Sequence, residues 1–258
     1  MEMKPVGEVF VGREGMVALV EFRRGPENFF DLGLISSLAE VYDDLGADPT
    51  CRAIVLASEG KAFCAGASYA ALQGEVNPQD LYDLYGAAAR LFACPKPVVA
   101  AIQGSAVGGG LGLALSADFR IASPEARFSA NFVKIGIHPG FGVSLTLPSL
   151  IGMQKAALMI MTGRRVRAEE ALAWGMVEDV VPAAELRPAA LALAQEIAES
   201  APLALTASRG TLRAGLAEAV SKRAEAEAAE QLRLYKTKDF LEGVKSVQER
   251  RVGNFVGA

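Results

Sequence analysis

A run of glycines and small residues at positions 103–112 is the feature of the sequence best suited to chemistry. It reads Gln-Gly-Ser-Ala-Val-Gly-Gly-Gly-Leu-Gly, follows an apolar segment typical of a buried strand, and opens a segment that we expect to be a helix. The start of a helix exposes N–H groups without intrahelical partners, at the positive end of the helix dipole. Glycines remove the side chains that would keep an anion away from those donors. The run therefore predicts a site for a phosphate or a developing oxyanion.

The spacing of these glycines excludes two common phosphate-binding motifs. No lysine follows the run, so it is not a P-loop, and the pattern Gly108-x-Gly110-x-Gly112 lacks the spacing of a dinucleotide-binding fingerprint. A second loop, residues 61–68 (KAFCAGAS), also follows a buried strand, and its glycine permits a tight turn. One N–H group from each loop, on neighbouring strands, could bind a single carbonyl oxygen.

His138 is the one histidine of the chain, so a His-rich metal site is excluded and any Ser-His-Asp mechanism would have to use it. An imidazole titrates near neutral pH. His138 is therefore the first candidate for moving a proton, and the alternative is a histidine hydrogen-bonded beneath its loop. The three cysteines (Cys51, Cys64 and Cys94) are too few and too scattered for a disulfide framework, and we expect Cys64 to be a small buried residue.

The composition is that of a globular protein: 258 residues, 51% hydrophobic and 22% charged, with a net charge of −4. This length supports one large domain or two small ones. No dense basic patch is evident, so we expect neither nucleic acid nor a membrane as a partner. The N-terminus lacks a basic region followed by an apolar run, so no signal peptide is predicted and the expected location is cytoplasmic.

The expected elements alternate between strand and helix in the first half of the chain, which predicts a layered α/β domain with parallel strands. The uncharged stretch at 97–117 has the length of a membrane span, but its glycines divide it into a buried strand and a buried helix. Expected strands lie at 17–22, 52–57, 96–102, 119–122, 127–129 and 177–181, and expected helices at 32–45 (with Asp31 as N-cap), 78–92, 154–161, 168–174, 183–200, 202–213 and 216–234.

The composition shifts after about residue 152, where the chain becomes helix-prone. We place the core at 1–195 and a C-terminal helical region at 196–258, and this region could pack on the core, on a neighbouring subunit, or both. The last long helix is charged and rich in alanine, so we expect it to face solvent or another subunit rather than a ligand.

Taken together, the two loops resemble those of the enoyl-CoA hydratase/isomerase (crotonase) superfamily. Residues 61–68 resemble its AFCAGAD loop, and residues 103–118 resemble its NGxAxGGGxxLALxCD segment. Asn28, Phe29 and Phe30 resemble its first CoA-side loop, and further matches lie at 128–142, 163–177 and 249–255. The matches run in order over nearly the whole chain.

The resemblance implies a spiral of ββα repeats with a C-terminal helical trimerisation region, and in many members a dimer of trimers. It also implies an acyl-CoA thioester as substrate, with coenzyme A as part of that substrate and no metal or other cofactor. The thioester oxygen would accept hydrogen bonds from the N–H groups of Ala67 and Gly109. Residues expected to contact substrate or CoA are Asn28, Phe29, Ala65, Gly66, Ser68, Gly112, Asn131, Phe132 and, acting in a neighbouring subunit, Arg250.

The chain departs from the family at the positions of its acids. The two glutamates of the hydratases correspond to Gly112 and Phe132, and the acid of some isomerases corresponds to Gly140. General acid–base catalysis contributes roughly 10²–10⁴-fold, so ordinary two-glutamate hydration is not expected. Gly112 and Phe132 predict a pocket that is roomier on one side and more apolar on the other, suited to a bulky or apolar acyl group.

Three tyrosines (Tyr69, Tyr82 and Tyr85) lie in or near the segment that covers the acyl group in this family, and we expect them to line the acyl pocket or the core. Asn131 and Ser129 could orient water but are not strong bases.

Three functions remain open. The first is hydration, isomerisation or a related lyase step on an enoyl-CoA, with His138 as the first candidate for proton transfer. The second is histidine-dependent C–C or thioester hydrolysis. The third is an acyl-CoA-binding protein that keeps the oxyanion site without catalysis.

Overall fold

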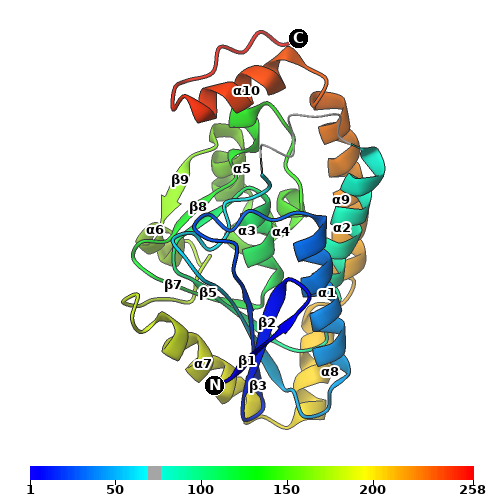
Figure 1. Ribbon diagram of the computed structural model, residues 1–258, viewed down its shortest axis with the longest axis vertical. Coiled ribbons are helices and arrows are strands. Elements are labelled where there is room, and N and C mark those ends of the chain that lie inside the picture. The colour runs from blue at the N-terminus through cyan, green and yellow to red at the C-terminus, as the bar shows by residue number, and fades with distance from the viewer. Residues whose placement is uncertain (69–76) are drawn as a thin grey trace.

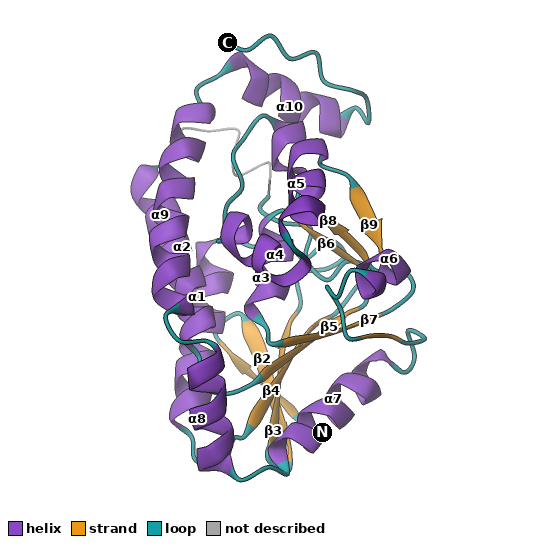
Figure 2. Ribbon diagram, turned by 180° about the vertical axis from the view of Figure 1, so that it is seen from behind, coloured by secondary structure: helices purple, strands orange, loops and turns teal. Residues whose placement is uncertain are grey.

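The computed structural model describes residues 1–68 and 77–258, and it has a layered α/β architecture (Figures 1 and 2). One sheet has the strand order β1-β2-β3-β4-β5-β7-β10, and a smaller sheet has the order β6-β8-β9. The strands are β1 (Met3–Val6), β2 (Val9–Glu14), β3 (Val17–Phe22), β4 (Ala53–Ser58), β5 (Val98–Ile102), β6 (Ser105–Val107), β7 (Phe119–Ala122), β8 (Arg127–Ser129), β9 (Arg165–Arg167) and β10 (Asp179–Val180).

The centre of the large sheet is parallel, as the alternation of strands and helices predicts. β3, β4, β5, β7 and β10 pair in parallel, and every residue of β3, β4 and β5 is buried. Parallel strands covered on both faces read as continuous apolar runs. The antiparallel hairpin of β1 and β2 was not predicted, because β1 is mostly exposed and carries no apolar alternation.

Side chains of the large sheet alternate between two cores. Val17 and Leu19 of β3 face α7 (Leu186–Ala198), whereas Ala18 and Val20 face the larger core on the opposite side. This is the period of two that a strand imposes. The other helices are α1 (Leu32–Ala47), α2 (Pro78–Ala93), α3 (Gly109–Ser116), α4 (Val143–Ile151), α5 (Met153–Thr162), α6 (Ala168–Ala173), α8 (Pro202–Leu212), α9 (Leu216–Leu234) and α10 (Lys238–Gln248), with a 3₁₀ turn, η1, at Asn131–Ile135.

The uncharged stretch at 97–117 folds as β5, β6 and α3, so the predicted division into strand and helix is confirmed. Within the described ranges, no helix is long and apolar enough to cross a membrane. The predicted N-cap of α1 is also confirmed, since the Asp31 carboxylate accepts a 3.0 Å hydrogen bond from the Leu34 N–H.

The C-terminal helices pack on the core of the same chain. The boundary predicted at residue 195 falls inside α7, which ends at Ala198. α9 packs along α2 and also reaches α4 (Figure 2). Packing on the core is one of the arrangements expected for the C-terminal region, and it buries Val220, Glu227 and Gln231 on one face of α9.

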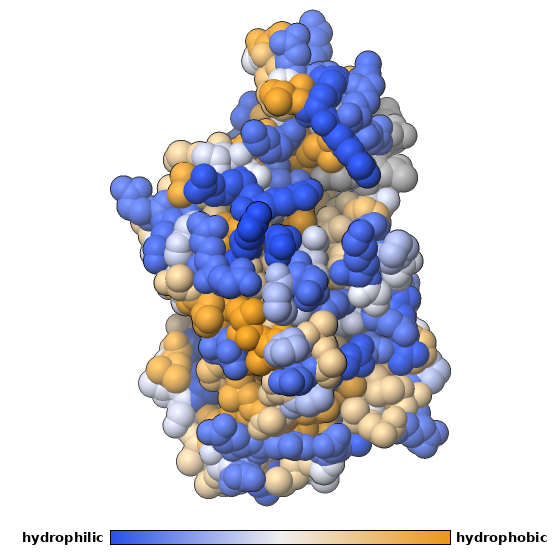
Figure 3. All heavy atoms as spheres, turned by 90° about the vertical axis from the view of Figure 1, so that its left-hand side faces the viewer, coloured by the Kyte–Doolittle hydropathy of each residue, from blue (hydrophilic) through white to orange (hydrophobic). Residues whose placement is uncertain are grey.

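The surface on the side of α6, α7 and β9 is mixed in character (Figure 3). Hydrophilic side chains dominate its upper half, and apolar ones gather lower down. β9, at the edge of the small sheet, was not predicted, since Arg165 and Arg167 flank a single buried valine.

Candidate active site

The two loops singled out in the sequence lie against each other. The Cys64 N–H donates to the Ser105 carbonyl and the Val107 N–H donates to the Cys64 carbonyl, both at 3.0 Å. A side chain at Gly104 would overlap the Lys61 carbonyl oxygen, and one at Gly110 would overlap the Cys64 carbonyl oxygen. Both glycines are therefore needed for the loops to approach this closely.

The loops carry two unpaired N–H groups into one cavity. Gly109 is the first residue of α3, so its N–H has no partner within the helix. Among residues 1–68 and 77–258, no acceptor is found for the N–H of Gly109 or of Ala67. Gly108 precedes the helix with a φ of +58°, a conformation that favours glycine. Two free donors at one cavity could bind a single carbonyl oxygen.

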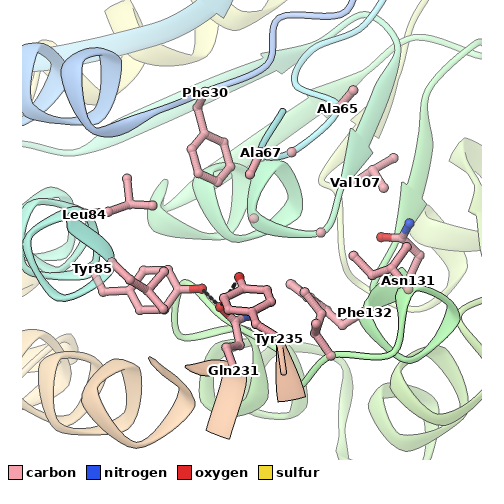
Figure 4. A pocket seen from close by; sticks show the side chains of 16 residues that line it. Phe30, Ala65, Ala67, Leu84, Tyr85, Val107, Asn131, Phe132, Gln231 and Tyr235 are labelled. Carbon is pink, nitrogen blue, oxygen red and sulfur yellow. Dashed lines mark hydrogen bonds between the residues drawn. The ribbon is translucent and has the colours of Figure 1, made fainter. Parts of the chain in front are cut away.

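The cavity encloses about 90 Å³ and is mostly apolar (Figure 4). The ring of Phe30 lies close enough to Gly109 that a side chain there would overlap it. The lining residues are Phe30, Ala65, Gly66, Ala67, Leu81, Leu84, Tyr85, Val107, Gly108, Gly109, Asn131, Phe132, Ile135, Ile137, Gln231 and Tyr235.

A hydrogen-bonded network of two tyrosines and a glutamine forms the polar part of this wall (Figure 4). The Tyr85 hydroxyl donates to Gln231 Oε1 at 2.7 Å, and the Tyr235 hydroxyl donates to the same oxygen at 3.1 Å. Gln231 Nε2 donates to the His138 carbonyl at 2.8 Å. Because that carbonyl can only accept, it fixes the orientation of the amide.

Neither glycine at an aligned acid position leaves space for a side chain. A Cβ atom at Gly112 would lie 2.7 Å from the Phe141 Cβ, so Phe141 fills that side of the site. The roomier pocket expected beside Gly112 is therefore wrong, and Gly112 does not line the cavity. A Cβ atom at Gly140 would overlap the Tyr85 hydroxyl. Phe132 does line the cavity, as an apolar wall.

His138 is not among the residues that line the cavity. Its Nδ1 lies 2.8 Å from the Pro139 carbonyl oxygen, an acceptor, so Nδ1 carries the proton. The backbone of His138 contributes to the site through its hydrogen bond with Gln231, but the imidazole is turned to its own loop. The structure does not bring this ring to the oxyanion site.

The predicted CoA-side residues take different positions. The Asn28 side chain is buried and fully engaged: Nδ2 donates to the carbonyls of Glu59 and Ala62, and Oδ1 accepts from the Arg24 N–H. The Asn28 side chain thus holds its own loop against residues 59–62, and it is not free to bind a ligand. Phe29 is partly exposed beside it.

Other predicted residues lie at or near the cavity. Ala65, Gly66 and Asn131 line it, and Ser68 follows Ala67 at the end of the described segment. Arg250 is exposed at the C-terminal end of the chain with a φ of +54°. The cavity does not include Arg250 or Tyr82, and Tyr69 lies outside the described residues.

Burial sets the ionisation of the site. It raises the pKa of the Tyr85 hydroxyl well above 10, with the nearby Tyr235 and Glu227 adding to the effect, and it also raises the pKa of Tyr235. These hydroxyls are donors rather than bases at neutral pH. Burial raises the pKa of Cys64 to about 12, so it is a small buried residue, as predicted, and not a nucleophile.

Gln231 and Tyr235 were missed by the sequence analysis. Glu227 and Gln231 of α9 and Tyr235 at its C-cap are spaced four apart, which places them on one helix face. Polar residues repeating on the face that also carries Val220 and Ala224 were the available signal. Among the described residues, no cluster of three or more His, Cys, Asp or Glu side chains could hold a metal ion.

Comparisons with known proteins agree with the architecture. The family profile of enoyl-CoA hydratase/isomerase matches residues 12–258. A Thermus thermophilus protein provisionally named an enoyl-CoA hydratase is 37% identical over 254 residues, covering 94% of this chain and 98% of the relative. Carnitinyl-CoA dehydratase of Salmonella enteritidis is 38% identical over 205 residues, 78% of each chain. The crystal structure of an enoyl-CoA hydratase/isomerase from Pseudoalteromonas atlantica superposes with a TM-score of 0.87 at 28% identity, covering 96% of this chain and all of that one. The chain belongs to the enoyl-CoA hydratase/isomerase family, within the crotonase superfamily.

Proposed function

We propose that this protein is an acyl-CoA enzyme that stabilises a thioester enolate with the N–H groups of Ala67 and Gly109. The observation that carries the proposal is the pair of unpaired donors at one cavity, one of them at a helix start. Negative charge that develops on the thioester oxygen meets fixed donors and the positive end of α3. One such donor contributes about 3–4 kcal/mol to the transition state.

The substrate class follows from the family and from the shape of the cavity. The relatives carry names that refer to enoyl-CoA and carnitinyl-CoA, so the proposed reaction is hydration, isomerisation or a related lyase step on a CoA ester. The acyl group would lie among Phe30, Leu84 and Phe132, which line the cavity. Coenzyme A would lie toward Phe29 and Ala65, with Arg250 acting from a neighbouring subunit.

A second candidate is an acyl-CoA-binding protein without turnover. Among the described residues, the cavity is lined by no carboxylate and no imidazole. Its polar side chains are two tyrosines of raised pKa and two amides, and none of these takes up a proton readily at neutral pH. Histidine-dependent hydrolysis is less well supported, because the His138 ring faces Pro139.

Uptake of deuterium at the α-carbon of a panel of acyl-CoA and enoyl-CoA esters in heavy water tests the proposal. Product analysis on the same samples identifies the reaction. Exchange or product that depends on the protein supports an enolate-stabilising enzyme. Tight binding of the esters with neither exchange nor product supports the binding protein, and no binding of any CoA ester refutes both.

A further inference from the structure

The polar network on the cavity wall has hydrogen-bonding capacity left over. Gln231 Oε1 already accepts two hydrogen bonds, and one Nε2 hydrogen is used by the His138 carbonyl. The second Nε2 hydrogen and the lone pairs of the two tyrosine oxygens have no partner in this network. The network therefore has one donor hydrogen and two acceptor oxygens beyond those that its internal hydrogen bonds use.

Tyr85 and Gln231 of this network are buried, so leaving their spare hydrogen-bonding groups without partners is unfavourable. Tyr85 is 7% exposed and Gln231 2% exposed, and both line the cavity. A buried polar group that lacks a partner destabilises its surroundings or a bound ligand. A plain alkyl chain would displace water from these groups without replacing its hydrogen bonds.

Charge restricts what can bind there. The cavity lining contains no cationic side chain among the described residues. Glu227, one helical turn before Gln231 on α9, is buried with its carboxylate bound to the Gly142 and Ser144 N–H groups and the Ser144 hydroxyl. A carboxylate of the ligand would therefore find no compensating charge in the cavity.

We propose that Tyr85, Gln231 and Tyr235 form a subsite for an uncharged oxygen group of the acyl chain, such as a hydroxyl. A hydroxyl would donate to a tyrosine oxygen and accept from Gln231 Nε2. The cavity has a volume of about 90 Å³, so esters with short acyl groups are the first to test. This inference rests on the proposed acyl-CoA function and replaces the bulky apolar group expected from the sequence.

Calorimetric titration with matched CoA esters tests the subsite. The ligands are butyryl-CoA, 3-hydroxybutyryl-CoA, 4-hydroxybutyryl-CoA and succinyl-CoA, each checked for integrity after titration. The protein should bind at least one hydroxybutyryl ester more tightly than butyryl-CoA, and succinyl-CoA most weakly. One hydrogen bond is worth roughly 2- to 10-fold in affinity. Tyr85→Phe and Tyr235→Phe should each reduce the ratio of hydroxybutyryl-CoA affinity to butyryl-CoA affinity by about that factor.

Tyr82→Phe is the matched control, since Tyr82 lies on α2 less than one turn from Tyr85 but does not line the cavity. It should retain the preference. The subsite is refuted if the unaltered protein prefers butyryl-CoA, or if both Phe variants at the network keep the full preference. If the subsite is refuted but butyryl-CoA still binds, the proposed acyl-CoA function stands. If none of the four esters binds, the subsite and the proposed function are both refuted. If Tyr85→Phe does not fold, the titration of Tyr235→Phe alone tests the subsite.

Discussion

At the residue scale, the site depends on backbone groups more than on side chains. Ala67 and Gly109 offer N–H donors, and their own side chains contribute almost nothing. The glycine run predicts exposed donors at the start of a helix, whereas the choice of Ala67 and Gly109 came from the family resemblance and stays a prediction. The sequence analysis chose His138 as a candidate from its position in the chain. The orientation of its ring could not be predicted from the sequence, because that orientation depends on a hydrogen bond to the Pro139 carbonyl.

Replacing His138 with alanine should leave the rate of α-deuterium uptake within about threefold of the unaltered protein. The imidazole does not line the cavity, and only the backbone carbonyl of His138 contacts Gln231. Rates measured between pH 5.5 and 8.5 would check this, because a histidine base titrates in that interval. A loss of 100-fold or more would restore His138 as the proton-transfer group.

The buried thiol of Cys64 predicts alkaline destabilisation. Burial raises its pKa from 9.0 to about 12. The folded protein therefore holds this proton more tightly than the unfolded chain does. The contribution of the protonated Cys64 thiol to the free energy of unfolding is fully present below pH 9 and is lost as the pH rises toward 12.

Denaturant unfolding at pH 8, 9.5 and 10.5 measures this loss. The free energy of unfolding should fall with pH more steeply in the unaltered protein than in Cys64→Ala, by up to about 1.4 kcal/mol per pH unit. Identical slopes in the two proteins would show that the thiol does not contribute.

At the scale of elements, α9 holds the turn that carries Phe141 beside the site. The Glu227 carboxylate accepts hydrogen bonds from the Gly142 N–H at 2.7 Å and the Ser144 N–H at 3.0 Å, at the start of α4. Phe141 has a φ of +62°, which is unusual for a bulky residue. The anchored turn thus keeps the Phe141 ring in the space next to Gly112.

Glu227→Gln should destabilise the protein by about 1–3 kcal/mol. The substitution removes the charge at the N-terminus of α4 and turns an NH₂ group toward N–H donors. Unfolding in urea measures the change. Glu230→Gln on the same helix is the control, because Glu230 is exposed and pairs only with Arg233 at the surface, where an ion pair contributes little. Equal effects of the two substitutions would contradict the anchoring role.

The elements differ in how well the sequence predicts them. β3, β4 and β5 were predicted because buried parallel strands leave continuous apolar runs. β6 was missed because it lies inside the glycine run, and β9 because two arginines flank its one buried valine. The buried face of α9 was missed because its polar residues pair with other elements far away in the sequence, such as Tyr85 of α2.

At the scale of the whole molecule, exposed apolar side chains support the assembly that the resemblance implies. α8 buries none of its residues, and Leu203 and Leu212 are each 86% exposed. Met153 and Met161 of α5 are 70% and 76% exposed. Such side chains mark a contact site only where they gather in one patch, so α8 and α5 are the helices to test.

We expect a trimer or a dimer of trimers in solution. Light scattering after size-exclusion chromatography should give three or six times the chain mass of 27.1 kDa. Leu203→Asp with Leu212→Asp should lower that mass if α8 lies in the contact. A mass of one chain for the unaltered protein at micromolar concentration would contradict the expected assembly.

The most direct test of the enolate-stabilising site compares Gly109→Pro with Gly109→Ala. Both add a Cβ atom against the Phe30 ring, but only proline removes the N–H, and the first position of a helix tolerates proline. With matched melting temperatures, α-deuterium uptake should be about 10²- to 10³-fold slower in Gly109→Pro than in Gly109→Ala. Equal rates in the two variants would contradict the assignment of this N–H to the oxyanion site.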